Sequence, residues 1–160
     1  MLSETDSTPV TRSLQSMGIP FRFFRHAGEV HSLEQAARER GQRPEQIVRS
    51  IVFRLTAGEY VMVLIAGGGQ VDWQSLRKYL GTSRISMASE SEVLEATGYP
   101  LGAVSAFGLP QPMRILADRS VFIEEEISIG SGLRYTTVIL RREDFQRALG
   151  KVETGDFGIP

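Results

Sequence analysis

The chain has 160 residues, of which 41% are hydrophobic and 23% are charged, so its composition is that of one globular domain and excludes a disordered chain. It contains no cysteine, which excludes disulfides, thiolate nucleophiles and cysteine–metal sites. Its net charge of -1 excludes a broad electrostatic attraction to nucleic acid, so a polynucleotide partner would have to be bound locally.

No segment of the chain has the pattern of a membrane or targeting segment. The longest apolar run, YVMVLIA, has the length of a strand, and the start of the chain lacks the basic and apolar regions of a signal peptide. We therefore expect no membrane partner and a cytoplasmic location, with which the absence of cysteine agrees.

Apolar periodicity, turn residues and capping residues predict the elements. In chain order we expect a helix over 8–19, a strand over 20–26, a helix over 32–41, strands over 47–54 and 59–69, a helix over 71–81, a strand over 83–88, a helix over 89–98, strands over 113–118, 122–130 and 133–141, and a helix over 142–150. The Gly/Pro-rich segment 99–112 is predicted to be a functional loop.

Three helices have clear N-terminal signals. Ser32 is the expected N-cap of the second helix, and Gln35 is expected to complete a capping box with it. Asp72 is the expected N-cap of the third helix, and Ser89 with Glu92 predicts a capping box for the fourth.

These elements predict a single α+β domain over residues 8–150. The strands over 47–54 and 59–69 are expected to form an antiparallel hairpin, and the sheet is expected to be mixed, mostly antiparallel and flanked by helices. Residues 1–7 are predicted to be a flexible N-terminal tail, and residues 151–160 a C-terminal tail.

The histidines do not predict a metal site, and the clustered carboxylates do not predict acid/base catalysis. The two histidines, His26 and His31, do not have metal-ligand spacing, so we expect no metal. His31 precedes a helix cap; hydrogen bonding to nearby backbone is the favoured interpretation and catalysis the alternative. In a strand, Glu124 and Glu126 would share one face, which favours a solvated sheet edge over an acid/base pair.

The strand over 47–54 contains a charge that needs an explanation. Alternation places Arg49 on the same face as Ile51 and Phe53, where burial is expected, and Ser50 on the other face. Because a buried unpaired guanidinium is too costly to persist, Arg49 needs a partner. That partner is either an internal carboxylate or an anionic or carbonyl ligand in a cleft, and the strand alone does not decide between them.

Residues 18–149 resemble one known family through several stretches in the same order. These stretches are VHSLEQAARERGQRPEQIVRSIVFR, VDWQSLRKYLG, MASESEVLEATGYPLGAVSAFG and ISIGSGLRYTTVIL. They are similar to the YbaK/ProX aminoacyl-tRNA deacylases, which are related to the editing domain of bacterial prolyl-tRNA synthetase. The resemblance implies a mixed sheet with flanking helices, a pocket for the charged 3′ end of a tRNA, and hydrolysis of a wrong aminoacyl ester without a metal or organic cofactor.

The resemblance also implies which residues form the site. Arg49 stands where the family has a lysine that contacts the substrate end. The loop from Gly102 to Ala106 matches a Gly-x-x-x-Pro loop whose backbone donors help to hold the carbonyl, so Arg49 and Gly102 are the expected catalytic residues. The expected substrate-binding residues are His31, Ser50, Ala103, Val104, Ser105, Ala106, Ser131, Gly132, Arg134 and Thr137.

Three residues depart from the family pattern. Arg49 replaces the lysine and presents a planar fork in place of a point charge, and Ala106 replaces the loop proline and loses its fixed φ. Thr137 stands where some relatives have an aspartate. Because a small pocket discriminates by only a few kcal/mol, such changes can redirect amino-acid preference.

The main hypothesis is a trans-editing hydrolase that deacylates mischarged aminoacyl-tRNA. Its expected partners are the aminoacyl-tRNA 3′ end and an aminoacyl-tRNA synthetase. One alternative is a binding module of the same fold with weakened catalysis, since both the lysine and the proline are replaced. Another is a hydrolase of other small aminoacyl esters or amides, which the weak net charge allows.

Overall fold

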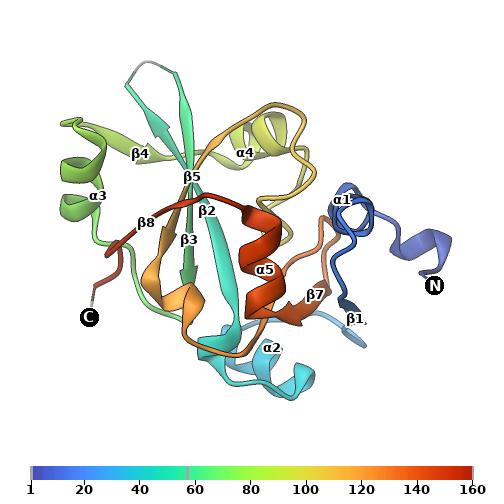
Figure 1. Cartoon of the computed structure of the whole chain (residues 1–160). Helices are drawn as coiled ribbons and strands as arrows, with labels where there is room; N and C mark the ends of the chain where they lie inside the picture. Colours follow the sequence, from blue (N-terminus) through green and yellow to red (C-terminus); the bar gives the residue numbers. More distant parts are fainter. Residues whose placement is uncertain (1, 57, 160) are drawn as a thin grey trace.

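The computed structural model describes residues 2–56 and 58–159, which form eight strands and five α-helices (Figure 1). The strands are β1 (Arg22–Arg25), β2 (Val48–Leu55), β3 (Tyr60–Ala66), β4 (Ile85–Met87), β5 (Arg114–Asp118), β6 (Glu126–Gly130), β7 (Thr136–Arg141) and β8 (Glu153–Gly155). The helices are α1 (Pro9–Ser16), α2 (Leu33–Arg40), α3 (Trp73–Leu80), α4 (Glu90–Thr97) and α5 (Arg142–Leu149), with short 3-10 helices η1 (Glu4–Asp6), η2 (Pro44–Gln46) and η3 (Arg119–Phe122). No helix in these ranges is both long and apolar enough to cross a bilayer.

The helix caps follow the sequence closely, with one difference. The hydroxyl of Ser32 accepts from the N–H of Gln35 at 3.0 Å, as predicted for the start of α2. The side chain of Gln35, however, accepts from the N–H of His31 at 2.9 Å, so the expected return bond to Ser32 is wrong. The capping box of Ser89 and Glu92 at α4 is confirmed, with bonds of 2.8 and 3.2 Å.

The strands form two sheets joined at one point. The larger sheet has the order β4-β2-β3-β5-β8, with β2 and β3 as the predicted antiparallel hairpin and β3, β5 and β8 parallel. The smaller sheet, β1-β7-β6, is antiparallel. A bridge from Ile47 to Ser128 connects the start of β2 to β6. The predicted α+β class with a mixed, mostly antiparallel sheet is confirmed.

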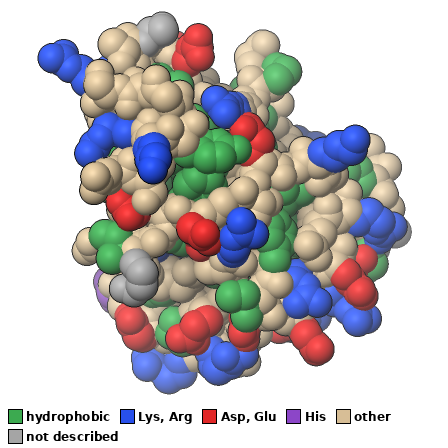
Figure 2. Space-filling model, turned by 60° about the vertical axis from the view of Figure 1, so that its left-hand side comes forward, with side chains coloured by type: hydrophobic (Ala, Val, Ile, Leu, Met, Phe, Trp, Pro, Cys, Tyr) green, Lys and Arg blue, Asp and Glu red, His purple; other side chains and the backbone are tan. Residues whose placement is uncertain are grey.

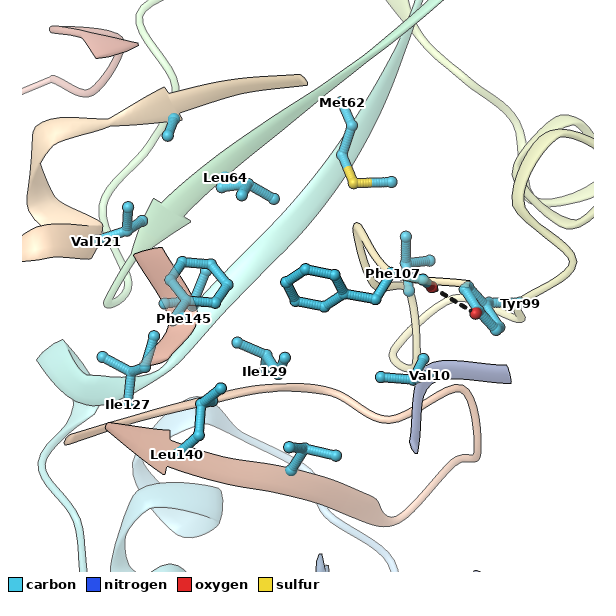
Figure 3. Packing of buried hydrophobic residues seen from close by; sticks show 14 of the residues in the cluster. Val10, Met62, Leu64, Tyr99, Phe107, Val121, Ile127, Ile129, Leu140 and Phe145 are labelled. Atoms are coloured by element: carbon cyan, nitrogen blue, oxygen red, sulfur yellow. Dashed lines mark hydrogen bonds between the residues drawn. The ribbon is translucent and has the colours of Figure 1, made fainter. Parts of the chain in front are cut away.

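The main core fills the space between the two sheets. Side chains from β3, β6, β7 and α5 meet there, and their burial removes apolar area from water (Figure 3). Labelled members are Met62, Leu64, Ile127, Leu140 and Phe145. At one end of this cluster the hydroxyl of Tyr99 donates to the carbonyl of Phe107 at 2.6 Å, which anchors the loop between α4 and β5.

A second apolar cluster covers the opposite face of the larger sheet. Phe53 of β2 and Val63 of β3 pack there with Leu76 of α3 and with Phe157. Because both faces of the β2–β3 hairpin are covered, its residues alternate between two buried environments. This placement agrees with the assignment of Arg49 and Ser50 to opposite faces.

The acidic segment before β6 differs from the expected strand. The carboxylate of Asp118 accepts from the N–H of Ser120 at 3.0 Å and begins η3, which ends at Phe122. Residues 123–125 form a turn, and only Glu126 of the three glutamates lies in β6. Glu124 forms an ion pair with Arg43. The predicted strand face shared by Glu124 and Glu126 is therefore wrong, because η3 and the turn after it occupy residues 119–125.

The two ends of the chain are more structured than the sequence suggested. Residues 153–155 form β8 beside β5, and Phe157 is 1% exposed, so residues 153–158 pack onto the domain where a C-terminal tail was predicted. The N–H of Phe157 donates to Asp118 at 2.7 Å, a long-range contact that no local pattern reveals. Asp6, in η1, forms an ion pair of 2.6 Å with Arg25, and the flexibility of residues 1–7 stays a prediction.

Charged side chains of both signs are interspersed on the face drawn in Figure 2. Elsewhere among the described residues, surface ion pairs include Arg54 with half-buried Glu92 and Arg114 with Glu153, each at 2.8 Å. Such pairs contribute little to stability, and a mixed surface produces no broad field for a polyanion. This arrangement agrees with the net charge of -1.

Candidate active site

A cleft of about 480 Å³ opens where one edge of β2 is unpaired. β4 pairs with residues 53–55, and β6 bridges Ile47, so residues 49–51 have β3 on one side and the cleft on the other. The cleft is lined by Val30, His31, Ser32, Leu33, Ala36, Arg40, Ile47, Val48, Arg49, Ser50, Ile51, Leu101, Gly102, Val104, Ser128, Ile129, Gly130, Thr136 and Thr137. It thus combines arginines, hydroxyls and apolar walls, with no carboxylate among these residues.

The backbone of Ser50 faces the cleft. In a strand, the N–H and C=O of successive residues alternate between the two edges. The N–H of Gly67 bonds to the carbonyl of Ile47 on the β3 side, whereas the N–H of Ala88 bonds to the carbonyl of Val52 on the β4 side. Ser50 lies two residues before Val52, so its N–H and C=O point to the same edge of β2 as those of Val52. At Ser50 this edge is open. A strand edge without a partner is a preformed pair of donor and acceptor groups.

Arg49 is held by backbone carbonyls of the glycine turn after β3. Its Nε–H donates to the carbonyl of Gly67 at 2.7 Å, and a terminal N–H donates to the carbonyl of Gly69. The partners of Arg49 within the protein are therefore main-chain carbonyls and not the internal carboxylate that was one of the two expectations, and an anionic or carbonyl ligand at its other N–H groups stays a prediction. Partial burial lowers the pKa of Arg49, but its remaining N–H groups stay charged donors at the cleft wall.

Two residues of the predicted loop line the cleft, and the other three lie outside it. Gly102, with φ of +89°, and Val104 line the cleft. Ala103 and Ser105 are 0% and 1% exposed, and the N–H of Ala103 already donates to the carbonyl of Pro100 at 3.1 Å. Within residues 2–56 and 58–159, the N–H groups of Gly102 and Val104 have no hydrogen-bond acceptor. Half-buried Ala106 packs against the main core.

The predicted wall residues Ser131, Gly132 and Arg134 do not line this cleft. The hydroxyl of Ser131 is buried and donates to the carbonyl of Leu133 at 3.0 Å. Gly132 and Arg134 border a separate hollow near α4, where Arg134 lies 3.4 Å from Glu90. Gly132 does support the loop, because its N–H donates to the carbonyl of Ala103 at 2.9 Å.

His31 lies at the exposed rim of the cleft, and Thr137 lies in its buried part. The side chain of His31 is 74% exposed and lies 3.8 Å from Glu29 at the rim. Thr137 is 1% exposed, and its hydroxyl donates to the carbonyl of Ile129 at 2.8 Å. Among the described residues, no cluster of three or more histidine, aspartate or glutamate side chains could hold a metal.

Arg40, Ser128 and Thr136 line the cleft but were not predicted from the sequence. One feature of the sequence indicates where Arg40 lies. It follows Ala36 by four residues and Ala37 by three, so it shares the buried face of α2. Ser128 and Thr136 had no local signal, since their position depends on how β6 and β7 dock beside β2.

Residues 27–148 match the family model described as the aminoacyl-tRNA editing domain. The chain belongs to this family. Within it, the multifunctional Ser/Thr-tRNA deacylase ProXp-y of Escherichia coli K12 is 29% identical over 138 residues, which cover 84% of this chain and 82% of that protein. The proline–tRNA ligase of Thermosipho melanesiensis is 32% identical over 124 residues, which cover 76% of this chain and 22% of the ligase. The chain thus spans about a fifth of the ligases that it matches.

Solved structures show the same editing-domain fold. A crystal structure described as a candidate trans-editing enzyme for prolyl-tRNA synthetase superposes with a TM-score of 0.87 at 22% identity, over 100% of both chains. A crystal structure of a hypothetical protein, APE2540, gives 0.84 at 23% identity, over 95% of this chain and 100% of that one. The family and fold predicted from the sequence are confirmed, and the roles of individual residues stay predictions.

Proposed function

We propose that this editing-domain protein hydrolyses the ester of mischarged aminoacyl-tRNA. The observation that carries the proposal is the open edge of β2, where Ser50 lines the same cleft as Gly102 and Val104, two residues whose N–H groups have no acceptor within residues 2–56 and 58–159. Unbonded amide donors on residues that line one small cleft suit an acyl group whose carbonyl oxygen becomes negative in the transition state.

The reaction needs little more than positioning and these donors. A water molecule, held directly or by the neighbouring ribose hydroxyl, adds to the ester carbonyl, and the bond to the ribose oxygen then breaks. The products are the free amino acid and the 3′-hydroxyl of the tRNA. Such a mechanism uses no protein nucleophile, which agrees with a cleft lined by hydroxyls, amides and arginines.

Arg49 is proposed to bind the substrate end with the N–H groups that the glycine carbonyls leave free. Because Gly67 and Gly69 fix one edge of the guanidinium, the other edge is preorganised for the phosphate of the terminal adenosine or for the aminoacyl carbonyl. Thr137 and Ser50 then form the floor, and His31 lies at the rim.

Several predicted residues are proposed to act by supporting the loop. They share burial or contact with the loop backbone and do not line the cleft: Ala103, Ser105, Ala106, Ser131, Gly132 and Arg134. Arg134, for example, donates from Nε to the carbonyl of Leu101 at 3.3 Å, next to Gly102. Substituting these residues is expected to make the positions of the Gly102 and Val104 N–H groups less fixed.

The decisive experiment measures deacylation of one tRNA carrying a panel of amino acids. Ser50→Pro removes the backbone N–H at an edge position where proline costs no ladder bond, and should lower kcat/KM about 100-fold. Ser50→Ala, which removes only the hydroxyl, is the matched control and should stay within about 3-fold. A folded parent protein that deacylates no member of the panel would contradict the proposal.

A binding module without turnover is the second candidate, favoured by the engagement of Arg49 with the Gly67 and Gly69 carbonyls. It predicts tight binding of a non-hydrolysable aminoacyl-tRNA without hydrolysis. Equal rates on aminoacyl-tRNA and on aminoacyl-adenosine would instead favour a hydrolase of small esters. A synthetase partner and a cytoplasmic location stay predictions.

A further inference from the structure

Arg40, which has no role in the proposed reaction, is a partly buried charge at the cleft wall. It lies at the C-terminal end of α2 and lines the cleft together with Ser128 of β6. Burial lowers its pKa to about 10, so the guanidinium is still protonated at neutral pH. A cation that is removed from water needs compensating acceptors.

Its compensation inside the protein comes from neutral groups. The Nε–H of Arg40 donates to Nε2 of His26 at 3.1 Å, and a terminal N–H donates to the hydroxyl of Ser128 at 2.9 Å. Since an arginine N–H can only donate, Nε2 of His26 is the acceptor and its imidazole is neutral, with the proton on Nδ1. That proton is donated to Glu39 at 2.6 Å.

Glu39 bonds to His26, and His26 bonds to Arg40; we call this chain the relay. It fixes the plane of the Arg40 guanidinium, but Glu39 does not contact the guanidinium and so does not form an ion pair with it. The side chain of His26 is fully buried, so the relay cannot swing into solvent. The carboxylate of Glu39 bonds to His26 and to Gln35. Arg40 therefore keeps further N–H groups that are charged and fixed in orientation, and it lines a cleft that has no carboxylate among its lining residues.

We propose that Arg40 determines which amino acid is removed, by bonding to a side chain that ends in an acceptor oxygen, a hydroxyl or a carboxylate. The inference rests on the proposed deacylation. The ester end is assigned to the Arg49 side of the cleft, which leaves the α2–β6 side, with Arg40 and Ser128, for the amino-acid side chain. A site built from oriented donors rejects an apolar side chain of equal size, because its buried donors would lose their partners.

The test uses one tRNA charged with serine or alanine, with threonine or valine, and with aspartate. The parent protein should favour the oxygen-bearing member of each matched pair, and Arg40→Met should lower that preference about 30-fold while changing the apolar rates less than about 3-fold. Arg38→Met is the control, because Arg38 lies in the same last turn of α2 but is exposed and outside the cleft. The aspartate arm separates a carboxylate site from a hydroxyl site.

Two results would overturn the inference: an unchanged preference in Arg40→Met, or an equal loss on every amino acid, which would assign Arg40 to the tRNA itself. If Arg40→Met does not fold, Arg40→Lys keeps the charge but loses the planar fork, and should lose about 10-fold of the preference. If the parent deacylates nothing, the proposed function fails, and binding of amide-linked seryl- and alanyl-adenosine tests Arg40 separately. Equal affinity of the parent for both analogues would then overturn the assignment.

Discussion

The two sides of the cleft each hold an arginine, but by different means. On the β2 side, Arg49 donates to the backbone carbonyls of Gly67 and Gly69. On the α2–β6 side, Arg40 donates to the side chains of His26 and Ser128. Every residue has a backbone carbonyl, whereas an imidazole acceptor or a buried hydroxyl exists only where that side chain is present.

This difference predicts how each side responds to substitution. The β2 side should tolerate changes in the residues that anchor its arginine, provided that the backbone conformation is kept. The α2–β6 side should fail when any member of its network changes, because a buried partner is then left unpaired. The following substitutions test that contrast, from the largest expected effect to the smallest.

Gly130→Ala should have the largest effect. A Cβ on Gly130 of β6 would overlap the carbonyl of Val104, so the loop and β6 could not keep their close contact. We expect a loss of about 3 kcal/mol in the free energy of unfolding, with loss of deacylation, measured by urea denaturation and by kinetics. A stable and active variant would show that the loop does not depend on this contact.

Arg49→Lys should have the next largest effect. One ammonium on a flexible stem does not reproduce the planar fork that spans the carbonyls of Gly67 and Gly69, so the free edge loses its orientation. We expect kcat/KM to fall about 10-fold, with little change in the melting temperature. A rise in activity from an inactive parent would instead support the binding module.

Acid should weaken the α2–β6 side through Glu39. Hydrogen bonds from Gln35 and then His26 lower the pKa of Glu39 below the usual 4.5. A lowered pKa means that the carboxylate stabilises the fold above 4.5 and that this contribution is lost as the pH falls through the lowered value. The melting temperature should therefore fall less between neutral and acidic pH in Glu39→Gln than in the parent. An equal fall in both proteins would contradict a stabilising contact between Glu39 and His26.

Gly69→Ala should have the smallest effect. A Cβ at this position meets no atom within 4 Å, and the carbonyl that accepts from Arg49 is retained. Stability should stay within about 0.5 kcal/mol of the parent, and deacylation should be unchanged. A large loss here would mean that the β2 side depends on side-chain identity as much as the α2–β6 side does.

Much of the fold could be predicted because its signals are local. The caps at Ser32, Asp72 and Ser89 each begin the expected helix. The prediction for residues 122–125 was wrong because a local cap at Asp118 begins a 3-10 helix there, and the prediction for residues 153–158 was wrong because their contacts are long-range. The carboxylate of Asp118 begins η3, after which β6 starts only at Glu126, and the same carboxylate accepts from the N–H of Phe157, 39 residues away.

The sequence by itself determined that Arg49 and Ser50 lie on opposite faces of a covered strand, because side chains in a strand alternate with a period of two residues. Only the tertiary structure decided that the edge beside them is open, since β4 pairs with residues 53–55 and Ser128 of β6 bridges Ile47. It also decided that Arg49 bonds to glycine carbonyls and that Arg40 reaches the same cleft. Strand edges and buried partners are chosen by contacts between distant segments, which local periodicity does not encode.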